Sequence, residues 1–222
     1  MIALKKNSNG VSLFTENSSF YNILISVIES RDLGDTSHSL RISLYTEILL
    51  KCLLKSKKYN LTQRDIKVYA DAAILHDIGK LMIPEAVLLK KGRFTPKEHE
   101  IMKLHSIRGA QIIESMRDSF NEDCYQICYD ICKYHHERWD GSGYPKQLQG
   151  EEIPFGARVV AIADVYDALT SAKPYKPRLP HKTAVEMITN GDCGMFDPAI
   201  LECFKTAKND FEKVSIKYFG EF

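Results

Sequence analysis

The sequence predicts an all-α fold, arranged as a single-domain helical bundle. Apolar residues recur at intervals of three and four along most of the chain, and no alternating run indicates a strand. Glycines and prolines separate these periodic segments without a linker or a repeat. A chain of 222 residues that is 44% hydrophobic is long enough to bury one sizeable core. We therefore expect an N-terminal segment over 1–17 and one folded domain over 18–222.

Composition excludes several classes of protein. The net charge of +1 argues against a nucleic-acid polymer or an anionic membrane as partner. No apolar run is long enough to cross a bilayer, and the N-terminus lacks the apolar stretch of a secretory signal. The six cysteines form neither a CxxC pair nor a disulfide framework. These features predict a reduced, cytoplasmic protein.

Three helices are expected in the first part of the chain. Apolar spacing predicts one helix over about 20–28 and a second over about 36–57. Thr62, followed by Asp65, resembles a capping box and opens the third. Gly79 is the expected end of that helix.

Further helices follow, and a long loop interrupts them. Thr95 is a predicted cap, because a proline and then a glutamate follow it. A long loop is expected where Gly141, Gly143, Pro145, Gly150 and Pro154 follow one another. Five more helices are predicted. Three of them begin at Pro96, Pro154 and Pro198, and the other two extend over about 121–136 and over 182–190.

Two short segments carry most of the chemical information. Residues 76–80 read HDIGK, and residues 135–145 read HHERWDGSGYP. Imidazole and carboxylate are ligands that suit iron, manganese and related divalent ions. Asp77 has two oxygens and can contact two ions at once, which a histidine cannot. We expect His76 and Asp77 in the last turn of the third helix, where both side chains can reach one ion.

Other residues of ligand type have competing interpretations. His105 lies on an otherwise apolar helix face and, taken alone, is more often a hydrogen-bonded core histidine than a ligand. His135 and His136, at a helix end before a glycine-rich turn, are harder to explain as core residues. Asp164 lies in an apolar helix, where a buried carboxylate is costly unless it is paired or bound to metal. Asp167 is either a second such group or an acceptor that orients a ligand histidine.

Long motifs in this chain resemble those of the HD-GYP phosphodiesterases, a branch of the HD-domain metal-dependent phosphohydrolases. The resemblance extends from about Glu29 to Pro198. It is carried by the segments at 29–41, 75–92, 102–113, 135–145, 153–176 and 196–198. It implies a helical bundle around a central metal cluster. It also implies hydrolysis of the bacterial second messenger cyclic di-GMP to the linear dinucleotide, and in some members on to GMP.

The resemblance implies a set of metal ligands in which Asp77 bridges two ions and takes part in catalysis. The implied ligands are His38, His76, Asp77, His105, His135, His136 and Asp164. Members with three metals carry a glutamate four residues before the position of His38, and this chain has Gly34 there. We therefore expect two divalent ions, Fe or Mn, about 3.5–4 Å apart, that clamp the phosphate and activate a water for in-line attack.

The substrate side of the site is implied by the same resemblance. Lys80 is expected to contact the phosphate and to offset charge in the reaction. Gly143, Tyr144 and Pro145 are expected to shape the wall beside the substrate. Lys173 and Lys176 are expected at the phosphate or guanine side, and position 173 is usually arginine in the family. The planar, bidentate fork of arginine is therefore absent at this position.

Alternatives to a cyclic di-GMP phosphodiesterase remain open. Lys173 mildly favours a phosphodiesterase for another cyclic dinucleotide or nucleotide. A non-catalytic module that binds the messenger is the third hypothesis, and the full set of ligand-type residues argues against it. Only about 28 residues precede the first motif, which is too few for a sensory domain. We therefore expect regulation through a homodimer or through a separate protein.

Two further features have simple structural interpretations. Cys124, Cys128 and Cys132 repeat every four residues and form one stripe on a helix. Small buried hydrophobic residues are a more common use of cysteine than a thiolate metal site or a redox switch. Trp139 either stacks on a base or anchors its loop, and the second role is favoured.

Overall fold

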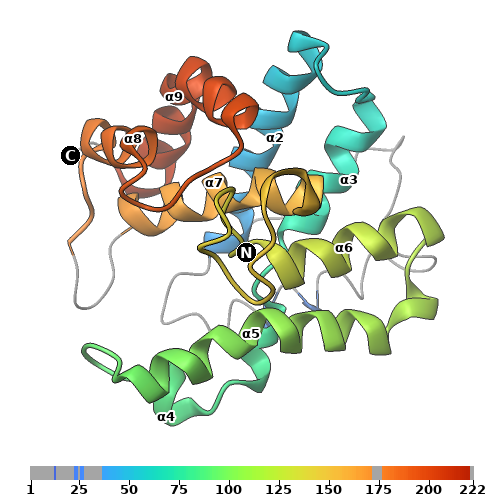
Figure 1. Ribbon diagram of the computed structural model, residues 1–222, viewed down its shortest axis with the longest axis vertical. Coiled ribbons are helices and arrows are strands. Elements are labelled where there is room, and N and C mark those ends of the chain that lie inside the picture. Colours follow the sequence, from blue (N-terminus) through green and yellow to red (C-terminus); the bar gives the residue numbers. More distant parts are fainter. Residues whose placement is uncertain (1–12, 14–22, 25, 28–36, 172–176, 221–222) are drawn as a thin grey trace.

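The computed structural model describes residues 13, 23–24, 26–27, 37–171 and 177–220 (Figure 1). The regular secondary structure of these residues is helical, and an isolated bridge joins Asp140 and Gln149. The elements are α2 (His38–Ser56), α3 (Gln63–Ala73), η1 (Ile78–Met82), α4 (Glu85–Leu88), α5 (Pro96–Ser115), η2 (Arg117–Ser119), α6 (Glu122–Tyr134), η3 (Gly150–Glu152), α7 (Phe155–Thr170), α8 (His181–Asn190) and α9 (Pro198–Phe219). The prediction of an all-α fold is confirmed.

The predicted helix starts follow from capping. Thr62 accepts a hydrogen bond from the backbone of Asp65, whose carboxylate accepts one from the backbone of Thr62. Thr95 forms the same box at the start of α5. The helix predicted over 20–28 falls largely outside the described residues, and those described within it, 23–24 and 26–27, are helical.

Helix α7 lies at the centre of the bundle. It contacts α2, α3, α6, α8 and α9 (Figure 1). The rings of Tyr45 and Phe211 stack with their centroids 4.6 Å apart, and Tyr166 packs edge-on against both. Because Phe211 is fully buried, the second half of α9 is part of the core.

A second layer is formed by η1, α4, α5 and α6. Helix α5 lies alongside α6, and η1 packs against α5 (Figure 1). Leu13 is buried in the main core, and its carbonyl oxygen accepts a hydrogen bond from the backbone of Asn121 at the start of α6. The boundary expected after residue 17 stays a prediction.

The expectation that Gly79 ends the third helix is wrong. Helix α3 stops at Ala73, and His76 and Asp77 lie in a tight turn whose backbone bonds connect residues three apart. Gly79 belongs to η1, where a Cβ atom would overlap the backbone of His105 and Gly109. The glycine is therefore required by the close approach of η1 to α5 and not by a helix end.

The cysteine stripe is buried in the core, as predicted. Cys124, Cys128 and Cys132 have no exposed surface, and burial raises the pKa of each thiol. The Cys132 thiol donates to the carbonyl oxygen of Leu75 at 3.1 Å. These thiols pack between α6 and its neighbours and are poorly suited to act as thiolates.

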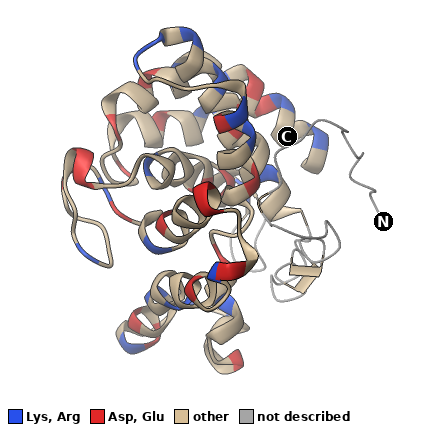
Figure 2. Cartoon of the chain, turned by 90° about the vertical axis from the view of Figure 1, so that its right-hand side faces the viewer, with Lys and Arg blue, Asp and Glu red and all other residues tan. Residues whose placement is uncertain are grey.

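The surface carries both signs of charge. Acidic and basic residues are interspersed over the helices in Figure 2, which agrees with the net charge of +1. Among the described residues, no helix combines the length and the apolar character needed to cross a membrane.

Candidate metal centre

The seven predicted ligands come from separate elements and converge near the middle of the molecule. His38 begins α2, His76 and Asp77 occupy the turn before η1, and His105 lies within α5. His135 and His136 directly follow α6, as predicted, and Asp164 lies within α7. Ligand atoms of six of them, all except Asp77, form two groups, and the members of each lie within 4.8 Å of one another. The groups are His105, His135 and His136, and His38, His76 and Asp164.

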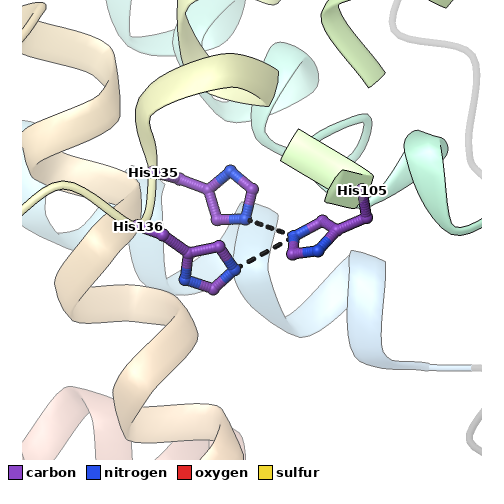
Figure 3. A group of neighbouring side chains, drawn as sticks. All are labelled: His105, His135 and His136. Atoms are coloured by element: carbon purple, nitrogen blue, oxygen red, sulfur yellow. Dashed lines mark hydrogen bonds between the residues drawn. The ribbon is translucent and has the colours of Figure 1, made fainter. Parts of the chain in front are cut away.

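In the first group, three imidazoles point toward one another (Figure 3). The Nε2 atom of His105 lies 3.0 Å from Nε2 of His136 and 3.4 Å from Nε2 of His135. His105 and His135 are almost fully buried. The arrangement gathers three ring nitrogens around one small space.

The hydrogen bonds of the opposite ring nitrogens decide which atoms carry protons. Nδ1 of His105 lies 2.7 Å from the carbonyl oxygen of Met102, and Nδ1 of His135 lies 2.9 Å from that of Ile131. Because a carbonyl oxygen only accepts, each Nδ1 carries a proton, and the neutral ring presents a lone pair at Nε2. Burial lowers the pKa of all three histidines, that of His135 to about 3. The facing Nε2 atoms of His105 and His135 are therefore both acceptors, which a shared cation would satisfy.

In the second group, His76 has the same arrangement. Its Nδ1 bonds the carbonyl oxygen of Ala73 at 2.8 Å, while its buried Nε2 has no hydrogen-bond partner. That Nε2 atom faces Oδ1 of Asp164 at 3.8 Å. Asp164 is less buried than its apolar helix suggested, with 16% of its side chain exposed. An unpartnered buried nitrogen beside a carboxylate fits a divalent cation.

The carboxylate of Asp77 lies between the two groups. Its Oδ2 atom is 3.3 Å from Nε2 of His76 and 3.5 Å from Nε2 of His38, whereas Oδ1 is 3.3 Å from Nε2 of His105. Lys80 approaches Oδ2 at 2.6 Å. Burial opposes ionisation of Asp77, but the charge of Lys80 and the hydrogen bond from His38 outweigh it and hold the pKa of Asp77 well below its usual range. A charged carboxylate thus presents one oxygen to each group.

His38 is oriented by a buried ion pair. Asp167 accepts from Nδ1 of His38 at 2.8 Å and from two nitrogens of Arg41 at 2.6 and 2.8 Å. Burial disfavours the charged form of His38, yet the bonds to Asp167 and Asp77 raise its pKa to about 10. Of the two roles considered for Asp167, the structure supports the acceptor that orients a histidine.

These donors fit two divalent ions. The first group offers imidazole nitrogens that bear lone pairs, and the second offers that of His76 and the carboxylate of Asp164. His38 joins the second group as a ligand once its Nε2 proton is released, and Asp77 adds one oxygen on either side. Mixed nitrogen and oxygen donors of this kind are typical of iron and manganese sites. The role of each residue as a ligand stays a prediction.

Of the residues predicted on the substrate side, Lys80 lies against Oδ2 of Asp77, and Gly143, Tyr144 and Pro145 belong to the loop beside the first group. The Tyr144 ring stacks on His136, with centroids 4.7 Å apart, and its backbone nitrogen donates to the carbonyl oxygen of His136. Gly143 is buried, and a Cβ atom there would overlap the backbone of residues 136–138. Pro145 follows in the same loop. Lys173 and Lys176 lie outside the described residues.

Glu137 and Arg41, for which the sequence predicted no role, support the site from behind. The buried carboxylate of Glu137 accepts hydrogen bonds from the backbone of Lys146 and Leu148, at 2.6 and 3.1 Å. It therefore fixes the loop that carries Tyr144. The available signal was a charged residue directly after two candidate ligands. The sequence signal for Arg41 was a charged residue on an apolar helix face, one turn after His38.

Comparison with known proteins identifies the family. The model of the HD domain family matches residues 22–200, which is most of the chain. This chain belongs to the HD-domain family. The resemblance of its motifs to the HD-GYP branch of HD domains is also confirmed by its relatives.

Two curated relatives are similar to this HD domain in sequence, and one solved structure is similar to it in fold. A cyclic di-GMP phosphodiesterase of Vibrio cholerae is 40% identical over 198 residues, which is 88% of this chain and 40% of the relative. A 3'3'-cGAMP-specific phosphodiesterase 2 of the same organism is 34% identical over 182 residues, or 82% of this chain and 33% of that protein. An HDG"Y"P protein from Bdellovibrio bacteriovorus has the same fold, with a TM-score of 0.60 at 18% identity, over 89% of this chain and 65% of that one. The chain thus spans less than half the length of these curated relatives.

Proposed function

We propose that this HD domain is a metal-dependent phosphodiesterase that hydrolyses cyclic di-GMP to the linear dinucleotide, with further hydrolysis to GMP left to the product analysis below. The observation that carries the proposal is the position of Asp77, which offers one carboxylate oxygen to each of two groups of ligand atoms. The relative named a cyclic di-GMP phosphodiesterase supports the choice of substrate.

We propose two divalent ions, Fe or Mn, held by His38, His76 and Asp164 on one side and by His105, His135 and His136 on the other. When bound, such a pair of ions supplies Lewis-acid stabilisation of a phosphoryl group and a water of lowered pKa. The protein supplies the rest of the chemistry. The neutral His105, His135 and His136 bind without first losing a proton, whereas His38, whose pKa is raised to about 10, releases one when an ion binds. The charged Asp77 balances part of the cationic charge.

Lys80 is the proposed contact for a phosphoryl oxygen. Its side chain is 20% exposed, and its ammonium lies 2.6 Å from Asp77. A fixed cation at this position attracts the anionic dinucleotide and offsets charge that develops on the phosphoryl oxygens. Tyr144, held against His136, forms the proposed wall of the substrate site. We place Lys173 and Lys176 at the phosphate or guanine side of the substrate.

We also retain a cytoplasmic location and a regulatory contact, through a homodimer or another protein, as parts of the proposal. The six cysteines are free thiols, as a reducing compartment requires. A cyclic dinucleotide is a better match than a nucleic-acid polymer for a chain of nearly neutral net charge.

The test is turnover by the purified chain after loading with Fe²⁺ or Mn²⁺. Products from cyclic di-GMP, 3'3'-cGAMP and cyclic di-AMP are separated by chromatography and compared with the bound metal content. We expect cyclic di-GMP to be linearised, with two ions per chain. Turnover of 3'3'-cGAMP alone would move the assignment to the other class of relative. Tight binding of cyclic di-GMP without turnover by the metal-loaded chain would support the hypothesis of a non-catalytic module that binds the messenger.

A further inference from the structure

Arg41 connects the candidate metal centre to a distant part of the chain. Its side chain is completely buried. Its Nε and Nη2 atoms donate to the two oxygens of Asp167, at 2.6 and 2.8 Å. The oxygen that accepts from Nη2 also bonds Nδ1 of His38 at 2.8 Å. The position of the guanidinium therefore determines how Asp167 holds His38.

The guanidinium is covered by the end of α9. The ring centroid of Phe219, the last residue of that helix, lies 4.3 Å from Cζ of Arg41. Tyr218 lies further away, at 5.9 Å. An aromatic face over a cation attracts it and also excludes water from it. Helix α9 packs along α2, so this contact joins the C-terminal turn of one helix to the first turn of the other (Figure 1).

The end of α9 is itself held in place. Nη1 of Arg178 donates to the carbonyl oxygens of Phe219 and Gly220, at 3.1 and 3.2 Å. These carbonyls at a helix end lack partners within the helix, and a cationic donor is favourable there. The ring of Phe219 is thereby fixed over Arg41 through its own backbone.

We propose that Phe219 is a positioning residue for the metal site that contains His38, acting through Arg41 and Asp167. This inference rests on the metal centre of the proposed function but not on the identity of the substrate. The ring keeps water away from the buried pair of Arg41 and Asp167. Asp167 then holds the His38 ring so that Nε2 points toward Asp77, 3.5 Å away.

Loss of the ring has a specific consequence. Water entering beside Arg41 raises the local dielectric and weakens its attraction for Asp167. His38 then gains rotational freedom, which must be lost again when an ion binds. Removing a group that orients a metal ligand typically lowers affinity about 10–100-fold, and Phe219 acts one step further out. We expect about a threefold to tenfold loss at the His38 group and none at the His105 group.

The experiment measures Co²⁺ binding alone, by titration of the visible absorption of the full chain. The His105→Ala background leaves the His38 group as the intact site, and the His76→Ala background leaves the His105 group. Phe219→Ala should weaken Co²⁺ binding in the first background and leave it unchanged in the second. Phe219→Tyr, which keeps the ring, should bind Co²⁺ in the first background as tightly as the chain with Phe219. Phe219→Leu, which keeps apolar cover without a ring face, should give a smaller loss. Ile216→Ala, at an exposed position in the same part of α9, is the matched control.

A double-mutant cycle tests the proposed route. If Phe219 acts through Asp167, then Phe219→Ala should have little further effect once Asp167→Asn is present. Equal losses with and without Asp167→Asn, or equal losses in both histidine backgrounds, would overturn the inference. Circular dichroism of the metal-free variants identifies any that fail to fold, and Phe219→Leu then carries the test. Wild-type protein that binds no ion overturns the metal centre itself, whereas two bound ions without turnover contradict only the proposed reaction.

Discussion

Oδ1 of Asp77 lies 3.3 Å from Nε2 of His105, although one residue belongs to the turn before η1 and the other to α5. The contact is possible because Gly79 brings the backbone of η1 against that of α5. Two ligand groups are thereby joined through one carboxylate.

Replacing Asp77 with asparagine should affect both ions. The amide keeps the size of the side chain but loses the charge and one of the two acceptor oxygens. We expect the bound metal to fall from two ions per chain to one or fewer and turnover to be lost. Elemental analysis after dialysis measures the first, and product chromatography the second. A variant that retains two ions and wild-type turnover would exclude a bridging role.

Single histidine changes should separate the two sites. His76→Ala removes a ligand from the His38 group, and His105→Ala removes one from the other. Each variant is expected to retain one ion that binds with near wild-type affinity, because the opposite group is intact. His99→Ala, a change of an exposed histidine on α5, is the control and should retain both ions. Complete loss of metal from both single variants would indicate one undivided site.

Gly79→Ala should be strongly destabilising. The new methyl group would overlap the backbone of His105 and Gly109, which cannot move as a flexible side chain can. Overpacking of this kind costs about 3 kcal/mol or more. Gly109→Ala is the matched comparison, because its nearest contact would be 3.3 Å and the helix interior favours alanine over glycine. Urea unfolding of the two variants should differ clearly, and similar midpoints would contradict a forced backbone contact.

The capping box at the start of α5 gives a prediction for stability. Thr95→Ala should lower the free energy of unfolding by about 1 kcal/mol, because the backbone of Glu98 loses its acceptor. Lys97→Ala, an exposed change in the same turn, should have little effect. Chemical denaturation at neutral pH measures both.

The capping box of Thr95 and Glu98 should also make the stability of the fold depend on pH. The hydrogen bond from Lys90, followed by those from Thr95, lowers the pKa of Glu98 from 4.5 to about 2. A carboxyl whose pKa is lower in the folded state stabilises the fold above its unfolded pKa, and this stabilisation is lost as pH falls from about 4.5 to about 2. The difference in stability between wild type and Glu98→Gln should therefore shrink over this interval. A constant difference would show that the charge of Glu98 contributes nothing.

Glu137→Gln should separate substrate binding from metal binding. The amide places a donor opposite a backbone N–H of Lys146 or Leu148, so one of the two hydrogen bonds is lost. We expect a higher KM for cyclic di-GMP with two ions retained, because the loop that carries Tyr144 loosens while the histidines stay in place. Loss of metal at unchanged KM would assign Glu137 to the ions instead.

The sequence was sufficient for the helices because capping and apolar spacing are local signals. Thr62 and Thr95 begin their helices where predicted, and Gly191 ends α8. The error at Gly79 arose because one residue type serves two purposes. A glycine that ends a helix and one that admits a neighbouring backbone look the same in a sequence, and only the position of α5 distinguishes them.

The candidate ligands were predictable largely through resemblance, since His105 alone had a more ordinary interpretation as a core residue. The division into two groups was not predictable, because it depends on how α2, α5, α6 and α7 cross. The contacts of Arg41 join residues far apart in the sequence and leave no local pattern. The substrate-side roles of Lys173 and Lys176 stay predictions.

The facing lone pairs of His105 and His135, together with the unpartnered nitrogen of His76, make the stability of the folded chain depend on the concentration of metal ions. A fold that leaves buried acceptors unpaired is weakened until cations arrive, and ions that bind only the folded chain stabilise it in proportion to the logarithm of their free concentration. We therefore expect a cell short of iron or manganese to lose the molecule itself, through unfolding and proteolysis, and not merely its catalytic rate.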